Sequence, residues 1–153
     1  MLIRELAAVV ALALAGPASA EVKSVSANGF EVASTATIAA PADRVYAALG
    51  EVSHWWSPSH TFSRDAGNLS IELRAGGCFC ERLKDGGSVQ DLQVVYAAPG
   101  QGLRLRGALG PLQTEGVDGT LSWTEQWAPR IDRVLDEQLQ RLKSFVEGKS
   151  PPQ

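Results

Sequence analysis

Residues 73–97 read LRAGGCFCERLKDGGSVQDLQVVYA and decide the fold class of this chain. Glycine turns at 75–77 and 84–87 separate short segments rich in hydrophobic residues. Such turns between hydrophobic segments are typical of β-hairpins. Because consecutive hairpins build an antiparallel sheet, the stretch and its flank predict strands at 68–73, 78–83 and 88–97.

The segments further out extend the sheet and then change character. Residues 30–38 alternate between hydrophobic and small or polar side chains, and residues 103–108 and 116–124 continue the strand pattern. Residues 129–147 instead place hydrophobic side chains at helical spacing, which predicts a helix about 30 Å long with Gly148 as its stop. The hydrophobic positions of that helix are Ile131, Val134, Leu135, Leu142, Phe145 and Val146.

Two short helical segments are expected between the first strand and the hairpins. Residues 39–50 carry Pro41 at the first turn and end at Gly50, and residues 54–58 read as a further turn closed by Pro58. The sequence therefore predicts an α+β fold with an antiparallel sheet of about six strands and one long C-terminal helix across one face. One helix cannot cover the whole concave face, so we expect an apolar cavity beneath it.

The N-terminal residues 1–20 have the pattern of a signal peptide. A single Arg4 precedes an apolar run at 6–15, and Ala18 and Ala20 supply the small residues of a cleavage site. The run is too short to cross a bilayer, so no membrane span is expected in the mature chain; a retained N-terminal anchor helix is the alternative. Cleavage after Ala20 would leave 133 of the 153 residues.

The mature chain suits a single exported domain. We expect this domain at 21–148, followed by a flexible tail at 149–153, in the periplasm or outside the cell. The net charge is −3, and Lys and Arg are scattered singly. Since a nucleic-acid interface needs a clustered basic face, no nucleic acid is expected as a partner.

Cys78 and Cys80 flank a single residue on one predicted strand, and their state is left open. On a regular strand their side chains share a face about 6.5–7 Å apart, whereas a disulfide needs Cβ atoms about 4 Å apart. We therefore expect buried free thiols. A strained or intermolecular disulfide and a metal site completed by His54 and His60 are the alternatives.

Three landmarks carry a resemblance to a known family. The chain has IAAPADRVYAAL at 38–49, an aromatic pair at Trp55 and Trp56, and LRAGG at 73–77, ahead of the long helix. This order resembles the START-like (SRPBCC) superfamily, and within it the branch of polyketide-cyclase-like proteins and homologues of the heat-shock-protein-90 ATPase activator. The likeness covers 30–123 and 128–147, and it implies a helix-grip fold around a ligand cavity.

The chain departs from that family at one place. The family's sheet normally has seven strands, whereas six are counted here, and only residues 125–129 lie between the last strand and the helix. About one hairpin is missing before the helix. The resulting unpaired edge predicts weaker stability or a homodimer formed through that edge.

The expected function is binding of a hydrophobic, lipid-like or aromatic small molecule. No catalytic residue, metal or cofactor is assigned, and the motifs of common hydrolases and phosphate sites are absent from the sequence. The candidate ligand-binding residues are Trp55, Trp56, Cys78, Cys80, Leu105, Trp123, Leu135 and Leu142.

Two other classes of function stay open. A cyclase or dehydratase would need a base or acid in the cavity, such as His54, Glu72 or Glu81. For these side chains, as for His60, we expect solvent or loop positions instead. A protein-interaction module of the chaperone-activator kind is the third possibility.

Arg104 and Arg106 share one face of a predicted strand. They could clamp an anionic headgroup, but charged residues on a strand more commonly face solvent. We expect both to be exposed.

Overall fold

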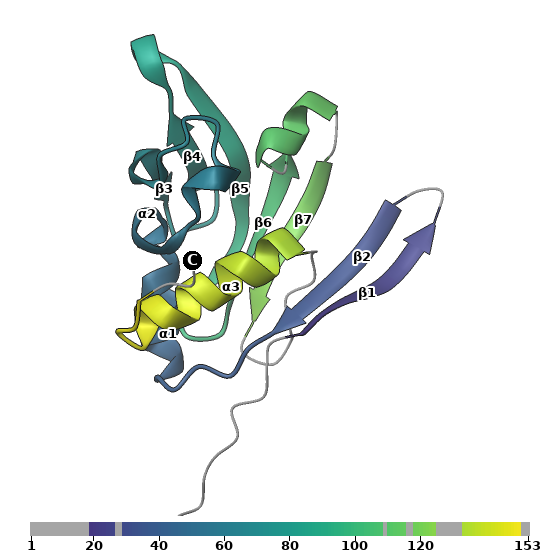
Figure 1. Ribbon diagram of the computed structural model, residues 1–153, viewed down its shortest axis with the longest axis vertical. Coiled ribbons are helices and arrows are strands. Elements are labelled where there is room, and N and C mark those ends of the chain that lie inside the picture. The colour runs from purple at the N-terminus through teal and green to yellow at the C-terminus, as the bar shows by residue number, and fades with distance from the viewer. Residues whose placement is uncertain (1–18, 27–28, 109, 116–117, 125–132, 151–153) are drawn as a thin grey trace, which may run out of the picture.

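The computed structural model describes residues 19–26, 29–108, 110–115, 118–124 and 133–150, and shows two antiparallel sheets with helices (Figure 1). The larger sheet has the order β3-β4-β5-β6-β7, and β1 pairs with β2 in a separate hairpin. The strands are β1 (Ser19–Ser26), β2 (Gly29–Thr35), β3 (Leu69–Ile71), β4 (Cys78–Arg82), β5 (Ser88–Ala98), β6 (Gly102–Ala108) and β7 (Asp118–Thr124). The helices are α1 (Ala42–Leu49), α2 (Val52–Trp55) and α3 (Arg133–Val146), with short 3-10 turns η1 (Pro58–His60), η2 (Ala66–Asn68), η3 (Lys84–Gly86) and η4 (Gly110–Glu115).

The α+β class with an antiparallel sheet and a C-terminal helix is confirmed, but the strand arrangement differs from the expectation. The predicted first strand, β2, pairs with β1 and with no other strand of the described chain. The expected single sheet of six strands is therefore a five-stranded sheet plus a hairpin. The predicted cleavage site after Ala20 lies inside β1, so a chain beginning at Glu21 would keep the pairs from Glu21↔Ala33 onward.

The β1–β2 hairpin stands apart from the large sheet (Figure 1). Its pairing shifts register between Val22 and Ser24, which leaves Lys23 as an extra residue in β1. The hairpin contacts α3. At the other end of the large sheet, β7 pairs with β6 and with no further described strand, so the homodimer through an open edge stays a prediction.

The glycine turn at 75–77 joins β3 to β4 and also contacts β5. The Gly76 N–H donates to Val94 O, and the Val94 N–H donates to Gly77 O, both at 2.8 Å. A Cβ atom at Gly77 would lie 2.2 Å from the Glu72 carbonyl oxygen, so no larger residue fits there. The predicted turn is thus fixed by close backbone approach as well as by hairpin geometry.

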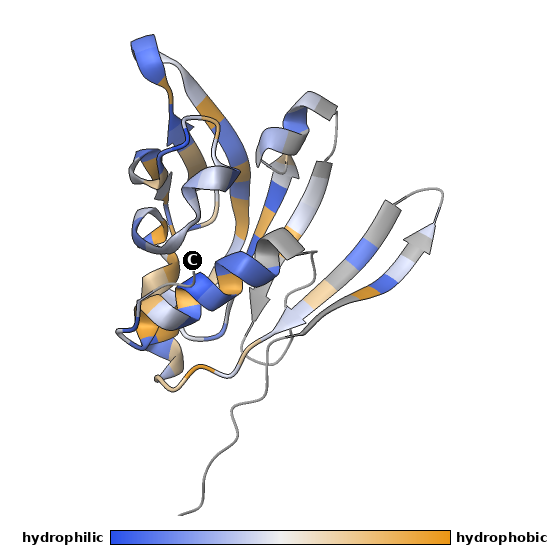
Figure 2. Cartoon of the chain, viewed as in Figure 1, coloured by the Kyte–Doolittle hydropathy of each residue, from blue (hydrophilic) through white to orange (hydrophobic). Residues whose placement is uncertain are grey.

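The helices cover one face of the large sheet, and their buried side chains build the core with it. Hydrophobic and hydrophilic residues alternate along α3 and along the strands, as Figure 2 shows. From α3, Leu139, Leu142 and Val146 belong to this core, and α3 contacts α1 and α2. The core on the sheet side comprises Leu69, Phe79, Leu92, Val94, Leu103, Leu105 and Leu121.

The C-terminal end of α3 lies where the sequence predicts it, next to Gly148. Gly148 has φ of 68°, its N–H donates to Phe145 O, and the Lys149 N–H donates to Ser144 O. This pair of bonds is a Schellman motif, which requires a left-handed residue at Gly148. Of the predicted start, residues 129–132, Ile131 included, lie outside the described part. No helix among the described residues is long and apolar enough to span a bilayer.

Candidate functional site

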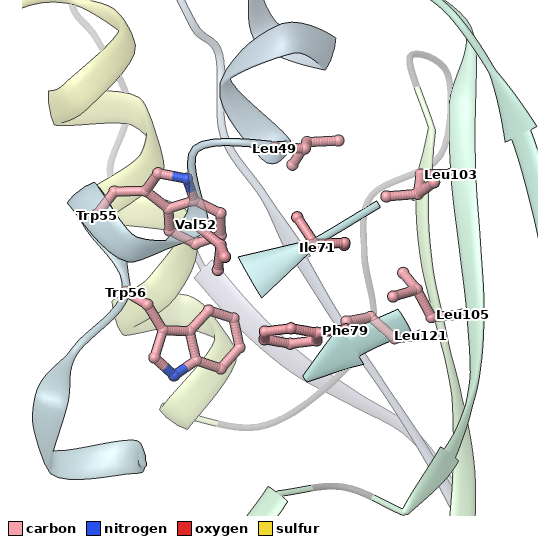
Figure 3. A pocket seen from close by; sticks show the side chains of 9 residues that line it. All are labelled: Leu49, Val52, Trp55, Trp56, Ile71, Phe79, Leu103, Leu105 and Leu121. Atoms are coloured by element: carbon pink, nitrogen blue, oxygen red, sulfur yellow. The ribbon is translucent and has the colours of Figure 1, made fainter. Parts of the chain in front are cut away.

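An apolar pocket lies between the α1–α2 segment and the large sheet (Figure 3). Its internal volume is about 10 Å³, roughly the space that one water molecule needs. All of the lining side chains are hydrophobic, and they come from α1, α2, the residue after α2, and strands β3, β4, β6 and β7. They are Leu49, Val52, Trp55, Trp56, Ile71, Phe79, Leu103, Leu105 and Leu121.

The two tryptophans meet this pocket in different ways. Trp55 is 2% exposed, and its indole N–H donates to Ala48 O at 2.8 Å. Trp56 is only half-buried, and its indole N–H donates to His60 O at 3.3 Å, a long hydrogen bond. The Trp56 ring packs edge-on against Phe79 at a centroid distance of 5.4 Å. Trp55 is therefore part of the fixed core, and Trp56 is the partly open wall.

The backbone around these tryptophans is held by polar side chains of α3. Arg141 Nε donates to Trp55 O at 2.8 Å, and the Ser57 N–H donates to Gln138 Oε1 at 2.7 Å. His60 Nε2 lies 3.0 Å from Glu137 Oε2. Burial alone would raise the pKa of Glu137, but hydrogen bonds from Ser57 and His60 and the charges of His60 and Arg141 lower it below its usual value. The role of α3 here is to fix the segment that carries the pocket wall.

The sequence-predicted binding residues divide into three groups. Trp55, Trp56 and Leu105 line the pocket. Leu142 is buried in the core, 1% exposed, but is not among the lining residues, because the pocket lies under α1 and α2 instead of under α3. The side chains of Trp123 and Leu135 lie outside the described part of the structure.

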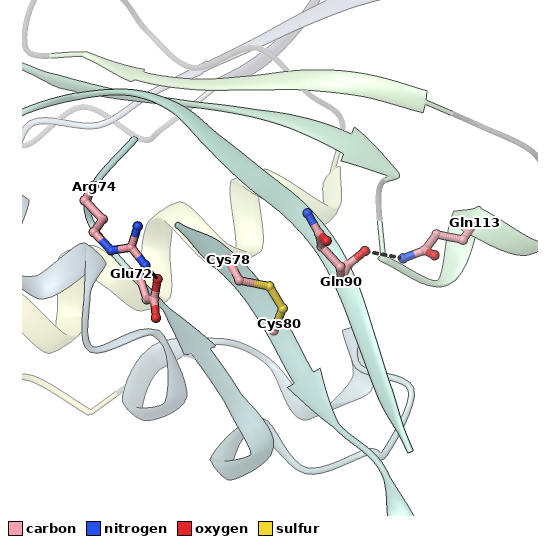
Figure 4. Close-up of a disulfide and its surroundings, with 6 residues drawn as sticks. All are labelled: Glu72, Arg74, Cys78, Cys80, Gln90 and Gln113. Atoms are coloured by element: carbon pink, nitrogen blue, oxygen red, sulfur yellow. Dashed lines mark hydrogen bonds and ion pairs between the residues drawn. A yellow bond between two sulfur atoms is a disulfide. The ribbon is translucent and has the colours of Figure 1, made fainter. Parts of the chain in front are cut away.

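Cys78 and Cys80 correct two expectations. They form a disulfide instead of free thiols, and their Cα atoms are 5.4 Å apart (Figure 4). Along β4 the half-buried Cys78 and Cys80 alternate with the buried Phe79 and Glu81, so the cysteines face away from the pocket. Within the described residues no three His, Cys, Asp or Glu side chains gather as a metal site would require.

Glu81 is buried on the same face of β4 as Phe79, which corrects the expectation that it faces solvent. It is 1% exposed. Its carboxylate accepts the backbone N–H groups of Phe62 at 2.9 Å and Ser63 at 2.5 Å. A buried carboxylate with two backbone donors fixes the loop between η1 and η2 over the sheet.

A second buried carboxyl, Asp91, lies close by on β5. Phe79 pairs with Leu92 and Cys80 pairs with Gln90, so Asp91 is the extra residue of a β-bulge. Asp91 is 5% exposed. Burial, and next the charge of Glu81, raise the pKa of Asp91 to about 7. Next to Glu81, the buried Asp91 is thus a carboxyl that can exchange a proton near neutral pH.

Asp91→Asn is expected to flatten the pH dependence of stability. The folded pKa of about 7 lies above the unfolded value of 3.8, so the folded state binds the proton more tightly. Stability therefore falls as pH rises from about 4 through about 7 and is level above that range. At pH 8 the variant should be more stable than the parent by about 2–3 kcal/mol, and near pH 4 the two should match. Urea unfolding across that pH range measures the difference, and equal slopes for both chains would contradict it.

The other polar candidates are placed away from the pocket. His54 and Glu72 have side chains 64% and 55% exposed, and Glu72 pairs with Arg74 on the surface (Figure 4). Arg104 and Arg106 are exposed on the outer face of β6, as expected. None of these four supplies an acid or base to the interior.

Comparisons with known proteins give no assignment. No protein-family model, no curated protein and no solved structure matches the chain.

Proposed function

We propose that the protein binds a small hydrophobic molecule in the apolar pocket between the α1–α2 segment and the sheet. The observation that carries the proposal is the lining, in which every side chain is hydrophobic and three are aromatic. Ligand pockets in proteins are mostly apolar and rich in aromatic side chains. Burial of an apolar ligand there would contribute about 25 cal/mol for each Å² removed from water.

Binding requires the pocket to widen, because its volume of about 10 Å³ has room for a water molecule only. Trp56 is the side chain that can move. It is half-buried and its indole hydrogen bond is long, whereas the backbone on both sides is held by Gln138 and Arg141. Rotation of the indole away from Phe79 would admit a ring-sized ligand without displacing α2.

Titration with the neutral fluorescent probe N-phenyl-1-naphthylamine tests the proposal. Saturable binding to the parent chain is expected, and Leu105→Phe, which fills the pocket, should weaken binding about tenfold or more. Trp56→Ala should tighten binding by about tenfold, because the indole no longer has to be displaced. Ligand fluorescence reports both changes.

The matched control is Tyr96→Ala, since Tyr96 is 50% exposed and does not line the pocket. It should leave the affinity unchanged. A parent chain that shows no saturation, or a Leu105→Phe variant with parental affinity, would rule out this pocket. Circular dichroism of each variant separates loss of binding from loss of fold.

A START-like, helix-grip relationship and export from the cytoplasm are part of the same proposal. The landmarks at 38–49, 55–56 and 73–77 support the relationship. The apolar run at 6–15 with its small-residue site supports export, as does the disulfide, since disulfides persist in oxidising compartments.

A cyclase or dehydratase is the second candidate function, favoured by one observation. Glu81 and Asp91 lie on the helix-covered face of the sheet, the same face as Phe79, and Asp91 titrates near neutral pH. A carboxylic acid held neutral by burial is a suitable proton donor. Turnover of an apolar substrate that is lost in Asp91→Asn while probe binding persists would favour the enzyme over the carrier.

A further inference from the structure

The disulfide between Cys78 and Cys80 lies on the face of the sheet opposite the apolar pocket. Both cysteines are half-buried, and their partners across the strands are polar: Gln93 and Gln90 on β5 and Ser70 on β3. Figure 4 shows the bridge running along β4. Only one residue separates the two cysteines. A bridge that closes so short a loop restricts the unfolded chain far less than one that closes a long loop. A role in stability alone therefore explains it poorly.

The bridge coincides with the bulge of the neighbouring strand. Two residues of a regular strand advance about 6.6 Å, whereas Cys78 and Cys80 are 5.4 Å apart at Cα. β4 is thus shortened where the cysteines are linked. Between Phe79 and Cys80, β5 advances by two residues, from Leu92 to Gln90, while β4 advances by one.

The extra residue of that bulge is Asp91, whose carboxyl is carried to the inner face. Asp91 and Leu92 are adjacent and both are buried, at 5% and 4% exposure, which regular alternation forbids. Burying a carboxyl is unfavourable. Some local feature must hold the bulge in place, and the bridge lies directly across from it.

We propose that Cys78 and Cys80 are a thiol–disulfide exchange site on the outer face of the sheet, and that their bond holds the β5 bulge that buries Asp91. Partly exposed disulfides are open to attack by thiolates. The reacting class is a thiol reductant, either a monothiol or a dithiol. When the bond opens, β4 can return to regular spacing, and β5 no longer needs its extra residue inside the ladder.

The exchange conserves atoms and electrons. A thiolate of the reductant attacks one cysteine sulfur and forms a new S–S bond, while the Cys78–Cys80 bond breaks and the other cysteine leaves as a thiolate that takes a proton from water. A second thiol of the reductant then displaces the remaining cysteine. The products are two protein thiols and the disulfide of the reductant, so two electrons enter the protein.

The first test uses the folded full chain without denaturant. The chain is equilibrated with graded ratios of reduced to oxidised glutathione, and in parallel with dithiothreitol, and free thiols are counted by alkylation and mass spectrometry. We expect reversible conversion to the dithiol with both reagents, and the ratio of their rates shows whether a monothiol or a dithiol suits the site. A bridge that opens only when the chain unfolds overturns the exchange site.

The second test follows the bulge by amide hydrogen exchange. Reduction should speed exchange at residues 90–92 by about tenfold, and leave the β6–β7 pair Leu105↔Leu121 unchanged. The double variant Cys78→Ser, Cys80→Ser should match the reduced parent. The reduced parent chain is sufficient for this test, so the test still stands if the double variant fails to fold. Unchanged exchange at 90–92 after reduction overturns the coupling to Asp91.

Discussion

Glu81→Ala is expected to lower the free energy of unfolding by about 3–5 kcal/mol at pH 5. The substitution removes the carboxylate that accepts the N–H groups of Phe62 and Ser63, and the residue is 1% exposed. Both donors are partly buried, and each donor left unpaired costs about 1–3 kcal/mol, and more when the lost acceptor is charged. Urea unfolding followed by circular dichroism measures the change.

Unfolding Glu81→Ala at pH 5 measures the loss of the hydrogen bonds to Phe62 and Ser63 separately from the repulsion between Glu81 and Asp91. At pH 5 Asp91, with a pKa of about 7, is protonated, so removal of Glu81 relieves little repulsion. At pH 8 Asp91 is ionised, and the same substitution should be less destabilising. Glu81→Gln keeps one acceptor and should cost about half as much at pH 5. In both variants the pKa of Asp91 should fall, since the charge of Glu81 is one of the causes that raise it.

Glu72→Ala is the matched control for Glu81. Glu72 follows the neighbouring strand β3 and pairs with Arg74 on the surface, where its side chain is 55% exposed. Exposed ion pairs contribute about 0–1 kcal/mol, so this variant should stay close to the parent. If the two glutamate variants had the same stability, the carboxylate would not be what holds the loop at Phe62 and Ser63.

Trp55→Ala is expected to destabilise the fold by about 3–5 kcal/mol, the usual range for deleting a buried large aromatic side chain. Trp55 is 2% exposed, and it contributes both the hydrogen bond to Ala48 O and a wall of the pocket. Weaker ligand binding by this variant, which the sequence suggests, would be mixed with partial unfolding. Thermal unfolding therefore has to accompany any binding measurement on it.

Two further variants separate the contributions of Trp55. Trp55→Phe keeps most of the apolar contact but loses the indole donor, which should cost about 1–2 kcal/mol. Trp56→Ala should cost less than Trp55→Ala, because Trp56 is half-buried and its hydrogen bond is longer. Equal losses at the two positions would contradict the division into a fixed and a movable tryptophan.

The sequence predicts the elements whose side chains repeat regularly. The meander β3 to β7 follows from the glycine turns, and the end of α3 follows from Gly148. Within the site, Trp55, Trp56 and Leu105 were found because aromatic and aliphatic residues on regular elements face a core.

Two features that the sequence does not predict, strand β1 and the burial of Asp91, coincide with β-bulges, which change which side of a strand faces inward. In β1 the register shift between Val22 and Ser24 interrupts the regular alternation by which a strand is recognised in a sequence. In β5 the shift at Asp91 carries a carboxyl inward that alternation with Leu92 would place in solvent. The sequence holds a signal for this bulge. Val89 and Leu92 are an odd number of positions apart, as expected of two hydrophobic residues with a bulge between them.

Glu81 and the cysteines were misjudged for different reasons. Glu81 and Phe79 are two positions apart on β4, so alternation alone places both on the inner face. The N–H groups that stabilise Glu81 there belong to a loop that no sequence pattern predicts. The disulfide was disfavoured because a regular strand keeps Cys78 and Cys80 too far apart. The shortened β4 removes that obstacle.

The anchoring of the tryptophan segment on α3 also has a consequence for biosynthesis. Ser57, His60 and Trp55 receive their partners from residues 81, 77 and 86 positions later in the chain. While the ribosome is still making those positions, the nascent segment has no anchor, and the leucines of α3 are absent from the core. Contacts between such distant positions make folding slow. Closure of the segment that carries the pocket wall therefore has to wait until α3 has been made.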